Sequence, residues 1–261
     1  MLPVLRNALI LIGGLLLVSM RVFAGQGLND EGASNVEPKK TLRLAGPPWE
    51  PFLYEQQPRK GLATEIVIEA FERAGYSVEV SIKPWRRVLA EAEKGMVDVL
   101  IGLWFNEQRA SNFLYSDPYY VNQISFISDQ SEVISYQKLD DLKGLKIGVR
   151  KGASFGHNFD NAAGLNKTPM VNALSMLKML ALGRIDIGIG DHLILSRLMQ
   201  KNKMLNEQLK FVEPAYTERE LHMAIVKSLA DHQAIVSAFN HHLRKMKQQG
   251  RVKEIIKTYS P

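Results

Sequence analysis

The spacing of apolar residues divides positions 41–103 into segments of alternating type. Residues 42–45 alternate ahead of a proline pair, residues 62–74 carry apolar side chains at helical spacing, and residues 97–103 are almost continuously apolar. The pattern predicts, in order, strand 42–45, helix 62–74, strand 78–82, helix 85–93 and strand 97–103. Strands and helices in alternation build a sheet with helices on its faces, so we expect an α/β fold.

The same rhythm starts again after residue 120. The second series of predicted elements consists of strands 124–127, 145–149, 185–189 and 221–226, helices 171–182, 191–200 and 231–248, and a short helix at the C-terminus. A glycine loop at 152–154 is expected to lead into one more helix. Because the series restarts, we expect two α/β units of comparable size and not one continuous doubly wound sheet.

Residues 1–40 do not share this pattern. Residues 1–24 combine a positively charged start, an apolar run at 8–18, and small or aliphatic side chains ahead of a cut after Ala24, which is the pattern of a secretory signal peptide. An uncleaved membrane anchor is the alternative, but the run is shorter than the roughly 20 residues that a spanning helix needs. Residues 25–40 are polar and aperiodic, and we expect a flexible leader there.

The composition of the 261-residue chain, with 46% hydrophobic and 23% charged residues, is that of a soluble globular protein. Without the predicted signal peptide the chain holds 31 Lys and Arg and 27 Asp and Glu, a net charge of +4. We find no basic stripe with interleaved aromatic residues, so we expect no nucleic-acid partner. The chain has no cysteine, and export without disulfides fits the periplasm of a bacterium. The histidine spacing does not predict a metal site, and we expect neither metal nor cofactor.

Three polar residues follow predicted strands, at the sheet edge where open α/β folds bind ligands. They are Arg109, Ser154 and Asp191. An arginine offers a planar fork that matches a carboxylate, and an aspartate accepts hydrogen bonds from an ammonium group, so together they would bind a zwitterion. Each residue also has an ordinary interpretation. Arg109 alone is a solvated loop charge, Ser154 is part of a common turn, and Asp191 is an N-cap for the helix that follows it.

Seven segments carry a resemblance to a known family. They are "GPPWEPF" (46–52), "GLATEIVIEAFERAG" (61–75), "PWRRVLAEAEKGMVD" (84–98), "NEQR" (106–109), "YSDPYY" (115–120), "LKGLKIGVRKGAS" (142–154) and "LGRIDIGIGD" (182–191). In this order the chain resembles the periplasmic solute-binding proteins of amino-acid ABC importers (bacterial extracellular solute-binding proteins, family 3), in a divergent branch with "PWRR".

The resemblance implies the two-lobed α/β fold of type II periplasmic binding proteins, with two hinge crossings. Lobe 1 would contain residues 41–121 and 220–261, and lobe 2 residues 122–219. Helix 231–248 would pack on lobe 1 through its single apolar stripe, which consists of Ile235, Phe239, Leu243 and Met246.

The resemblance also implies roles for individual residues. Arg109 matches the arginine that holds the ligand α-carboxylate, Ser154 matches a residue that binds the same group, and Asp191 matches the aspartate that holds the α-ammonium. Trp49 and Trp85 match the side chains on either side of the ligand. Tryptophan is also a common core residue, which is the alternative for both.

The sequence departs from the family pattern in several places. The segment "GLWF" puts the bulky Trp104 and Phe105 where many relatives have a small polar residue, and we count Gly102 and Trp104 among the ligand-binding candidates. Gly46 replaces the acid that binders of basic amino acids keep. Arg150 replaces a neutral residue that faces the cleft, which would suit an acidic group on the ligand.

A protein of this type closes around its ligand and needs no reaction. We therefore expect a non-enzymatic, monomeric periplasmic protein that binds a small amino acid or related carboxylate and delivers it to an inner-membrane ABC permease or to a receptor. One alternative is a dehydratase or lyase on the same scaffold, for which Glu50 is the nearest candidate acid or base. The other is a sensory binding protein without transport.

Overall fold

The computed structural model describes residues 40–55 and 60–261. The predicted signal peptide (1–24) lies outside the described residues, and so does the predicted leader (25–40) apart from Lys40. Within the described ranges, no helix is both long enough and apolar enough to cross a lipid bilayer. The first described element begins at Thr41, where the periodic pattern of the sequence also begins.

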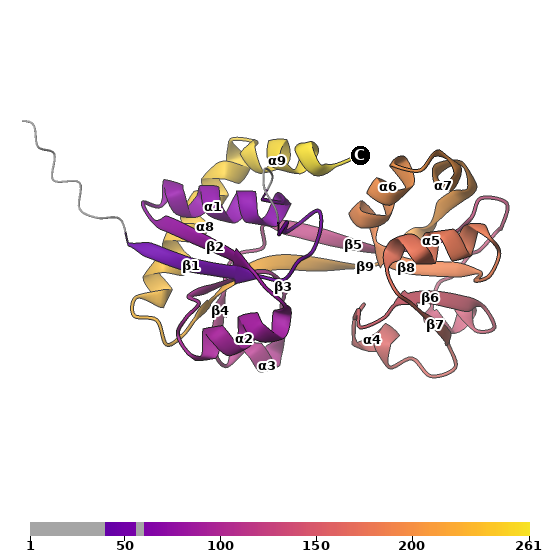
Figure 1. Cartoon of the computed structure of the whole chain (residues 1–261), viewed down its shortest axis with the longest axis horizontal. Helices are drawn as coiled ribbons and strands as arrows, with labels where there is room; N and C mark the ends of the chain where they lie inside the picture. The colour runs from indigo at the N-terminus through magenta and orange to yellow at the C-terminus, as the bar shows by residue number, and fades with distance from the viewer. Residues whose placement is uncertain (1–39, 56–59) are drawn as a thin grey trace, which may run out of the picture. The chain divides into compact units, whose positions relative to one another are not determined.

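The first group of elements surrounds three parallel strands (Figure 1). It comprises β1 (Thr41–Gly46), α1 (Leu62–Arg73), β2 (Ser77–Ile82), α2 (Trp85–Glu93), β3 (Val99–Trp104), α3 (Glu107–Ala110) and β4 (Phe113–Tyr115). Side chains alternate across the sheet. Val99 and Ile101 pack on the side of α1, whereas Leu100 packs on the side of α2. The continuous apolar run of β3 thus reflects a strand that is buried on both faces.

The second group has the same plan with a different set of helices. It comprises η1 (Leu139–Leu142), β6 (Lys146–Arg150), α4 (His157–Asp160), β7 (Asn166–Met170), α5 (Ala173–Ala181), β8 (Ile187–Asp191), α6 (His192–Gln200) and α7 (Lys203–Gln208). β6 lies between β7 and β8 and is parallel to both. The apolar residues of this group again form two clusters, one containing Phe159 and the other Met176.

Two long antiparallel strands, β5 (Tyr120–Asp129) and β9 (Leu209–Val226), join the groups. β9 pairs with β3 and β4 through its last residues, and β5 pairs with β8, so the main strand order is β2-β1-β3-β9-β5-β8-β6-β7. Hydrogen bonding is therefore continuous through both groups, although each group has its own parallel strands and helices, as expected for two α/β units. The connection passes through the two long strands, because β9 pairs with β3 and β5 pairs with β8.

The apolar stripe predicted for the long C-terminal helix is confirmed. The helix is α8 (His232–Gln248), followed by α9 (Arg251–Tyr259). Its stripe is buried together with residues of α1 and β1, and consists of Ile235, Phe239, Leu243 and Met246. The basic side chains of α8 lie on its other face, so this helix is a packed part of the first group.

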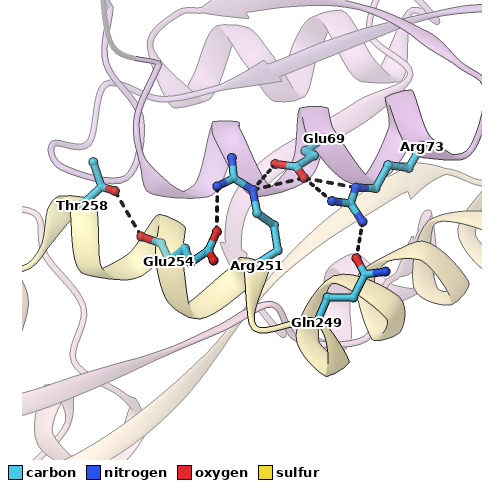
Figure 2. A network of polar contacts seen from close by, with 6 residues as sticks. All are labelled: Glu69, Arg73, Gln249, Arg251, Glu254 and Thr258. Carbon is cyan, nitrogen blue, oxygen red and sulfur yellow. Dashed lines mark hydrogen bonds and ion pairs between the residues drawn. The ribbon is translucent and has the colours of Figure 1, made fainter.

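Polar side chains tie α1 to the C-terminal helices (Figure 2). Glu69 of α1 accepts a hydrogen bond of 2.7 Å from Arg73 on its own helix and one of 2.9 Å from Arg251 at the start of α9. Arg73 in turn donates to Gln249, over 2.7 Å, and Arg251 donates to Glu254 over 3.1 Å. The Glu69 carboxylate thus links two guanidinium groups. Through them the network connects α1 to α9 and to Gln249 at the end of α8.

Several short or polar elements were not predicted from the sequence. They are α3, β4, β7, α7 and the first half of β9. β7 has the sequence NKTPM and lies at the end of the strand order, where a proline and polar residues are tolerated because no further strand needs their N–H groups. α3 has four residues, too few for an apolar period to be visible.

Candidate functional site

The site residues predicted from the sequence line a cavity of about 650 Å³. Its lining includes all eight of the candidates: Trp49, Trp85, Gly102, Trp104, Arg109, Arg150, Ser154 and Asp191. They come from β3, β6 and β8, from the loops after β1 and β6, from the start of α2 and from α3. The structure therefore brings the candidates together, although they are up to 142 positions apart in the chain (Trp49 to Asp191).

A short helix positions the backbone of Arg109. The residue lies in α3, where the side chain of Asn106 caps the helix by accepting a hydrogen bond of 2.9 Å from the Arg109 N–H. Its guanidinium carbon lies 5.2 Å from the ring centre of Trp85, a distance that favours a cation–π contact. Among the described residues, no carboxylate forms an ion pair with Arg109. This guanidinium is a half-buried cation that can pair with an anion in the cavity.

Asp191 is both the N-cap of α6 and a buried anion. Its Oδ1 accepts a hydrogen bond of 3.0 Å from the N–H of Ile194, and its Oδ2 accepts one of 2.7 Å from Nδ2 of Asn122. Only 6% of the residue is exposed. Burial raises the pKa of the Asp191 carboxyl to about 6, although the hydrogen bonds from Asn122 and the helix N-terminus lower it in part. No cation pairs with Asp191 within the described part of the chain, so an ammonium group would meet an uncompensated carboxylate.

Asn122 connects Asp191 to the tryptophan wall of the cavity. Nε1 of Trp104 donates a hydrogen bond of 2.9 Å to Oδ1 of Asn122, whose amide hydrogen goes to Asp191. The ring of Trp49 meets that of Trp104 edge-on, with 5.6 Å between ring centres. Sequence analysis missed Asn122. Its signal is a polar residue in phase with the inward-facing Ile124 of the same strand, and both are fully buried.

The hydroxyl group of Ser154 is occupied within its own loop. It donates a hydrogen bond to Asp160, whose other oxygen accepts from the N–H of Phe155 over 3.0 Å. Ser154 lines the cavity, but in this conformation its hydroxyl hydrogen is not available to a ligand. The helix that the loop leads into, α4, has four residues.

Gly102 shapes the cavity wall through its backbone. Its φ of +75° lies in the left-handed region, and the pairing of β3 with β9 shifts register across this position. A Cβ at Gly102 would lie 2.6 Å from Cδ1 of Leu53, and the Gly102 N–H donates to Oη of Tyr119 over 3.1 Å. At Gly46 a Cβ would lie 2.3 Å from Cδ2 of Leu53. An acidic side chain therefore has no space at Gly46 in this packing.

Three arginines and two carboxylates line the cavity: Arg109, Arg150, Arg219, Glu50 and Asp191. Sequence analysis missed Arg219, which lies in β9 with its guanidinium carbon 4.7 Å from the ring centre of Trp104. The surrounding sequence TERE (217–220) is charged and contains no motif that would identify Arg219 as a site residue. In the chain as described, no group of three His, Asp or Glu side chains is placed to hold a metal ion.

Comparisons with known proteins identify the family of the chain. The family model for bacterial extracellular solute-binding proteins, family 3, matches residues 43–261. The L-cystine-binding protein TcyJ of Escherichia coli (strain K12) is 26% identical over 256 residues, which cover 95% of this chain and 90% of that protein. A probable amino-acid ABC transporter-binding protein of Haemophilus influenzae is 24% identical over 230 residues, 86% of each chain.

The structure of the L-cystine solute receptor of Neisseria gonorrhoeae, in an unliganded open conformation, superimposes with a TM-score of 0.66. The two chains are 22% identical, and the match covers 85% of this chain and 93% of that one. The fold is the α/β fold of type II periplasmic binding proteins, as the sequence pattern predicts. The chain belongs to the bacterial extracellular solute-binding proteins of family 3.

Proposed function

We propose that this protein captures a small zwitterionic amino acid, or a close relative of one, in the cavity that Arg109 and Asp191 line. One observation carries the proposal: a half-buried guanidinium without a carboxylate partner and a buried carboxylate without a cationic partner, both within the described residues, face the same 650 Å³ cavity. Unpaired charges in a partly desolvated site are costly. A ligand that carries an α-carboxylate and an α-ammonium group relieves both costs at once.

Capture would couple to movement of two lobes, with lobe 1 at residues 41–121 and 220–261 and lobe 2 at 122–219. The two boundaries support each other, because Val121 and Glu220 are direct register partners in the β5–β9 ladder. A hinge at this pair needs only small backbone changes in two strands. Closure is driven by the difference in the ligand's affinity for the two states, and no bond is made or broken.

The proposed setting is the bacterial periplasm, reached through the predicted signal peptide, with a monomer that delivers its ligand to an inner-membrane ABC importer or a receptor. The names of the relatives support an importer as the partner. An enzyme is not favoured. The family consists of solute-binding proteins, and Glu50, the candidate acid or base, lines the cavity but is exposed.

A thermal-shift panel tests the proposal. The purified mature protein is heated with each of the common L-amino acids, with L-cystine, and with the matching amines that lack the carboxylate. We expect at least one α-amino acid to raise the melting temperature and its amine to raise it far less, because Arg109 would have no group to bind. A panel in which no α-amino acid raises the melting temperature would overturn the proposal.

A further inference from the structure

We propose that the ligand's side chain ends in an anionic group, and that Arg219 binds it at a second subsite beside Trp104 with help from Arg150. This inference rests on the proposed function. It adds the chemical class of the ligand and a specificity-determining residue that the sequence pattern did not reveal.

Arg219 is aimed into the cavity by its strand. In β9, successive side chains point to opposite faces, so the neighbouring Glu218 and Glu220 lie on the other face of the strand from Arg219. Glu220 approaches His222 at 3.8 Å instead. Within the described ranges, no carboxylate forms an ion pair with Arg219 or Arg150. Both cations are therefore uncompensated by the described part of the protein.

The Arg219 guanidinium lies over the ring of Trp104. The guanidinium carbon lies 4.7 Å from the ring centre of Trp104, and the Trp104 ring is fixed by its hydrogen bond to Asn122. A Cβ at Gly156, in the loop before α4, would lie 3.3 Å from Nη1 of Arg219, so this glycine leaves the arginine room. A stacked guanidinium still presents its in-plane N–H groups, which match the oxygens of a carboxylate, sulfonate or phosphate.

The charges of the cavity favour a further anion. A zwitterion would pair its carboxylate with Arg109 and its ammonium with Asp191, which leaves the exposed Arg150 and the half-buried Arg219 opposite one acid among the described lining residues, the exposed Glu50. When a ligand fills the cavity and excludes water, an unpaired cation that loses its hydration weakens binding. A ligand whose side chain carries a negative charge turns this cost into an attraction, and a neutral ligand of the same shape does not.

Matched ligand pairs test the inference by isothermal titration calorimetry. The pairs are L-aspartate with L-asparagine, L-glutamate with L-glutamine, and L-cysteate with L-cysteine, so that carboxylates and a sulfonate are compared separately. The protein variants are wild type, Arg219→Gln, Arg219→Lys and the control Arg184→Gln. Arg184 is exposed after α5 and does not line the cavity.

We expect wild type to bind at least one anionic member about tenfold or more tightly than its neutral partner, a ratio worth about 1.4 kcal/mol. Arg219→Gln should reduce that ratio to less than about threefold while neutral ligands keep their affinity, since a single charged hydrogen bond supplies this order of discrimination. Arg219→Lys should keep an intermediate ratio, because the charge stays but the stacked fork is lost, and this variant serves if the glutamine variant does not fold. Arg184→Gln should leave the ratio unchanged.

Three results would overturn the inference, and they differ in whether the proposed amino-acid site is also affected. Equal affinities within every pair would refute the anionic side chain while leaving the proposed amino-acid site intact. A full anionic preference retained in Arg219→Gln would refute the role of Arg219. The absence of binding to any of these ligands would overturn the inference, whereas the proposed function would fall only if the thermal-shift panel also showed no α-amino acid that binds.

Discussion

The side-chain amide of Asn122 donates a hydrogen bond of 2.7 Å to the carboxylate of Asp191. Asn122 is fully buried, and its oxygen accepts from Trp104. One side chain on the crossing strand β5 therefore positions the anion at the end of β8 and the tryptophan at the end of β3. The two halves of the proposed ligand site are held in relation to each other by this amide.

Replacing Asn122 with Ala should destabilise the protein. The indole N–H of Trp104 and one oxygen of Asp191 would lose their partner in a site with little water, which costs about 1–3 kcal/mol in the free energy of unfolding. Urea unfolding followed by circular dichroism measures the loss. Asn158→Ala is the matched control, because Asn158 is exposed outside the cavity, and it should change the free energy by no more than about 0.5 kcal/mol. Equal effects of the two substitutions would count against the bridging role.

Replacing Asp191 with Asn should change how stability depends on pH. The folded-state pKa of Asp191 is about 6, compared with an ordinary value of 3.8. Between these values the folded protein holds a proton that the unfolded chain has released, so the ligand-free protein loses stability as the pH rises through this window. The asparagine side chain of the Asp191→Asn variant would keep an N-cap without the charge.

The measurement is the free energy of unfolding of wild type and Asp191→Asn at pH 4, 5, 6 and 7, without ligand. The variant should gain on wild type as the pH rises, by up to about 3 kcal/mol across the window. Other carboxyls titrate equally in both proteins and cancel in the difference. A difference that stays constant with pH would show that Asp191 is ionised throughout, contrary to its buried position.

Ligand affinity should fall as the pH drops below about 6. An ammonium group binds to the ionised carboxylate, so Asp191 must release its proton when the pH is below its pKa of about 6. We expect the dissociation constant to rise about tenfold per pH unit in this range, and protons to be released on binding. Calorimetry in two buffers with different ionisation enthalpies detects that release. Binding without proton release at pH 5 would mean that the ligand does not use Asp191 as an anion.

Gly102→Ala should destabilise the protein more than Gly95→Ala does. Both glycines have positive φ, +75° and +70°, so both substitutions carry a backbone penalty of about 1–2 kcal/mol. A Cβ at Gly102 would also lie 2.6 Å from the buried side chain of Leu53, whereas a Cβ at Gly95 has nothing within 4 Å. The extra crowding costs about 1–3 kcal/mol, which thermal or urea unfolding would resolve. Similar losses of stability in the two variants would mean that the side chain of Leu53 moves to make room for the added Cβ at little cost.

The periodic elements of this fold could be predicted from the sequence because their apolar spacing is determined locally. The strand at β3 and the helix at α8 each bury a continuous apolar stripe, and both were found. The polar half of β9 could not be found in this way. Its residues are held in a strand by pairing with β5, a contact between segments 80 to 99 positions apart, from Asp129 with Leu209 to Val121 with Glu220.

The site followed the same division. Arg109 and Asp191 lie after or at the ends of predictable strands, so their placement on one cavity could be anticipated from the edge at which such sheets bind ligands. Asn122 and Arg219 lie within the crossing strands, and their importance depends on a partner that only the fold supplies, Trp104. The hydrogen bond from Ser154 to Asp160, six positions along the chain, also could not be predicted from the sequence.

The central claim is that Arg109 binds the α-carboxylate of the ligand, and a cycle of two ligands and two proteins tests it most directly. The dissociation constants of the best-binding α-amino acid and of its decarboxylated amine are measured by calorimetry for wild type and for Arg109→Ala. We predict that removing the carboxylate weakens binding to wild type at least about tenfold, and that the same removal has little effect in the variant, since the two changes delete one interaction. An equal loss of affinity in both proteins would mean that Arg109 does not bind the α-carboxylate.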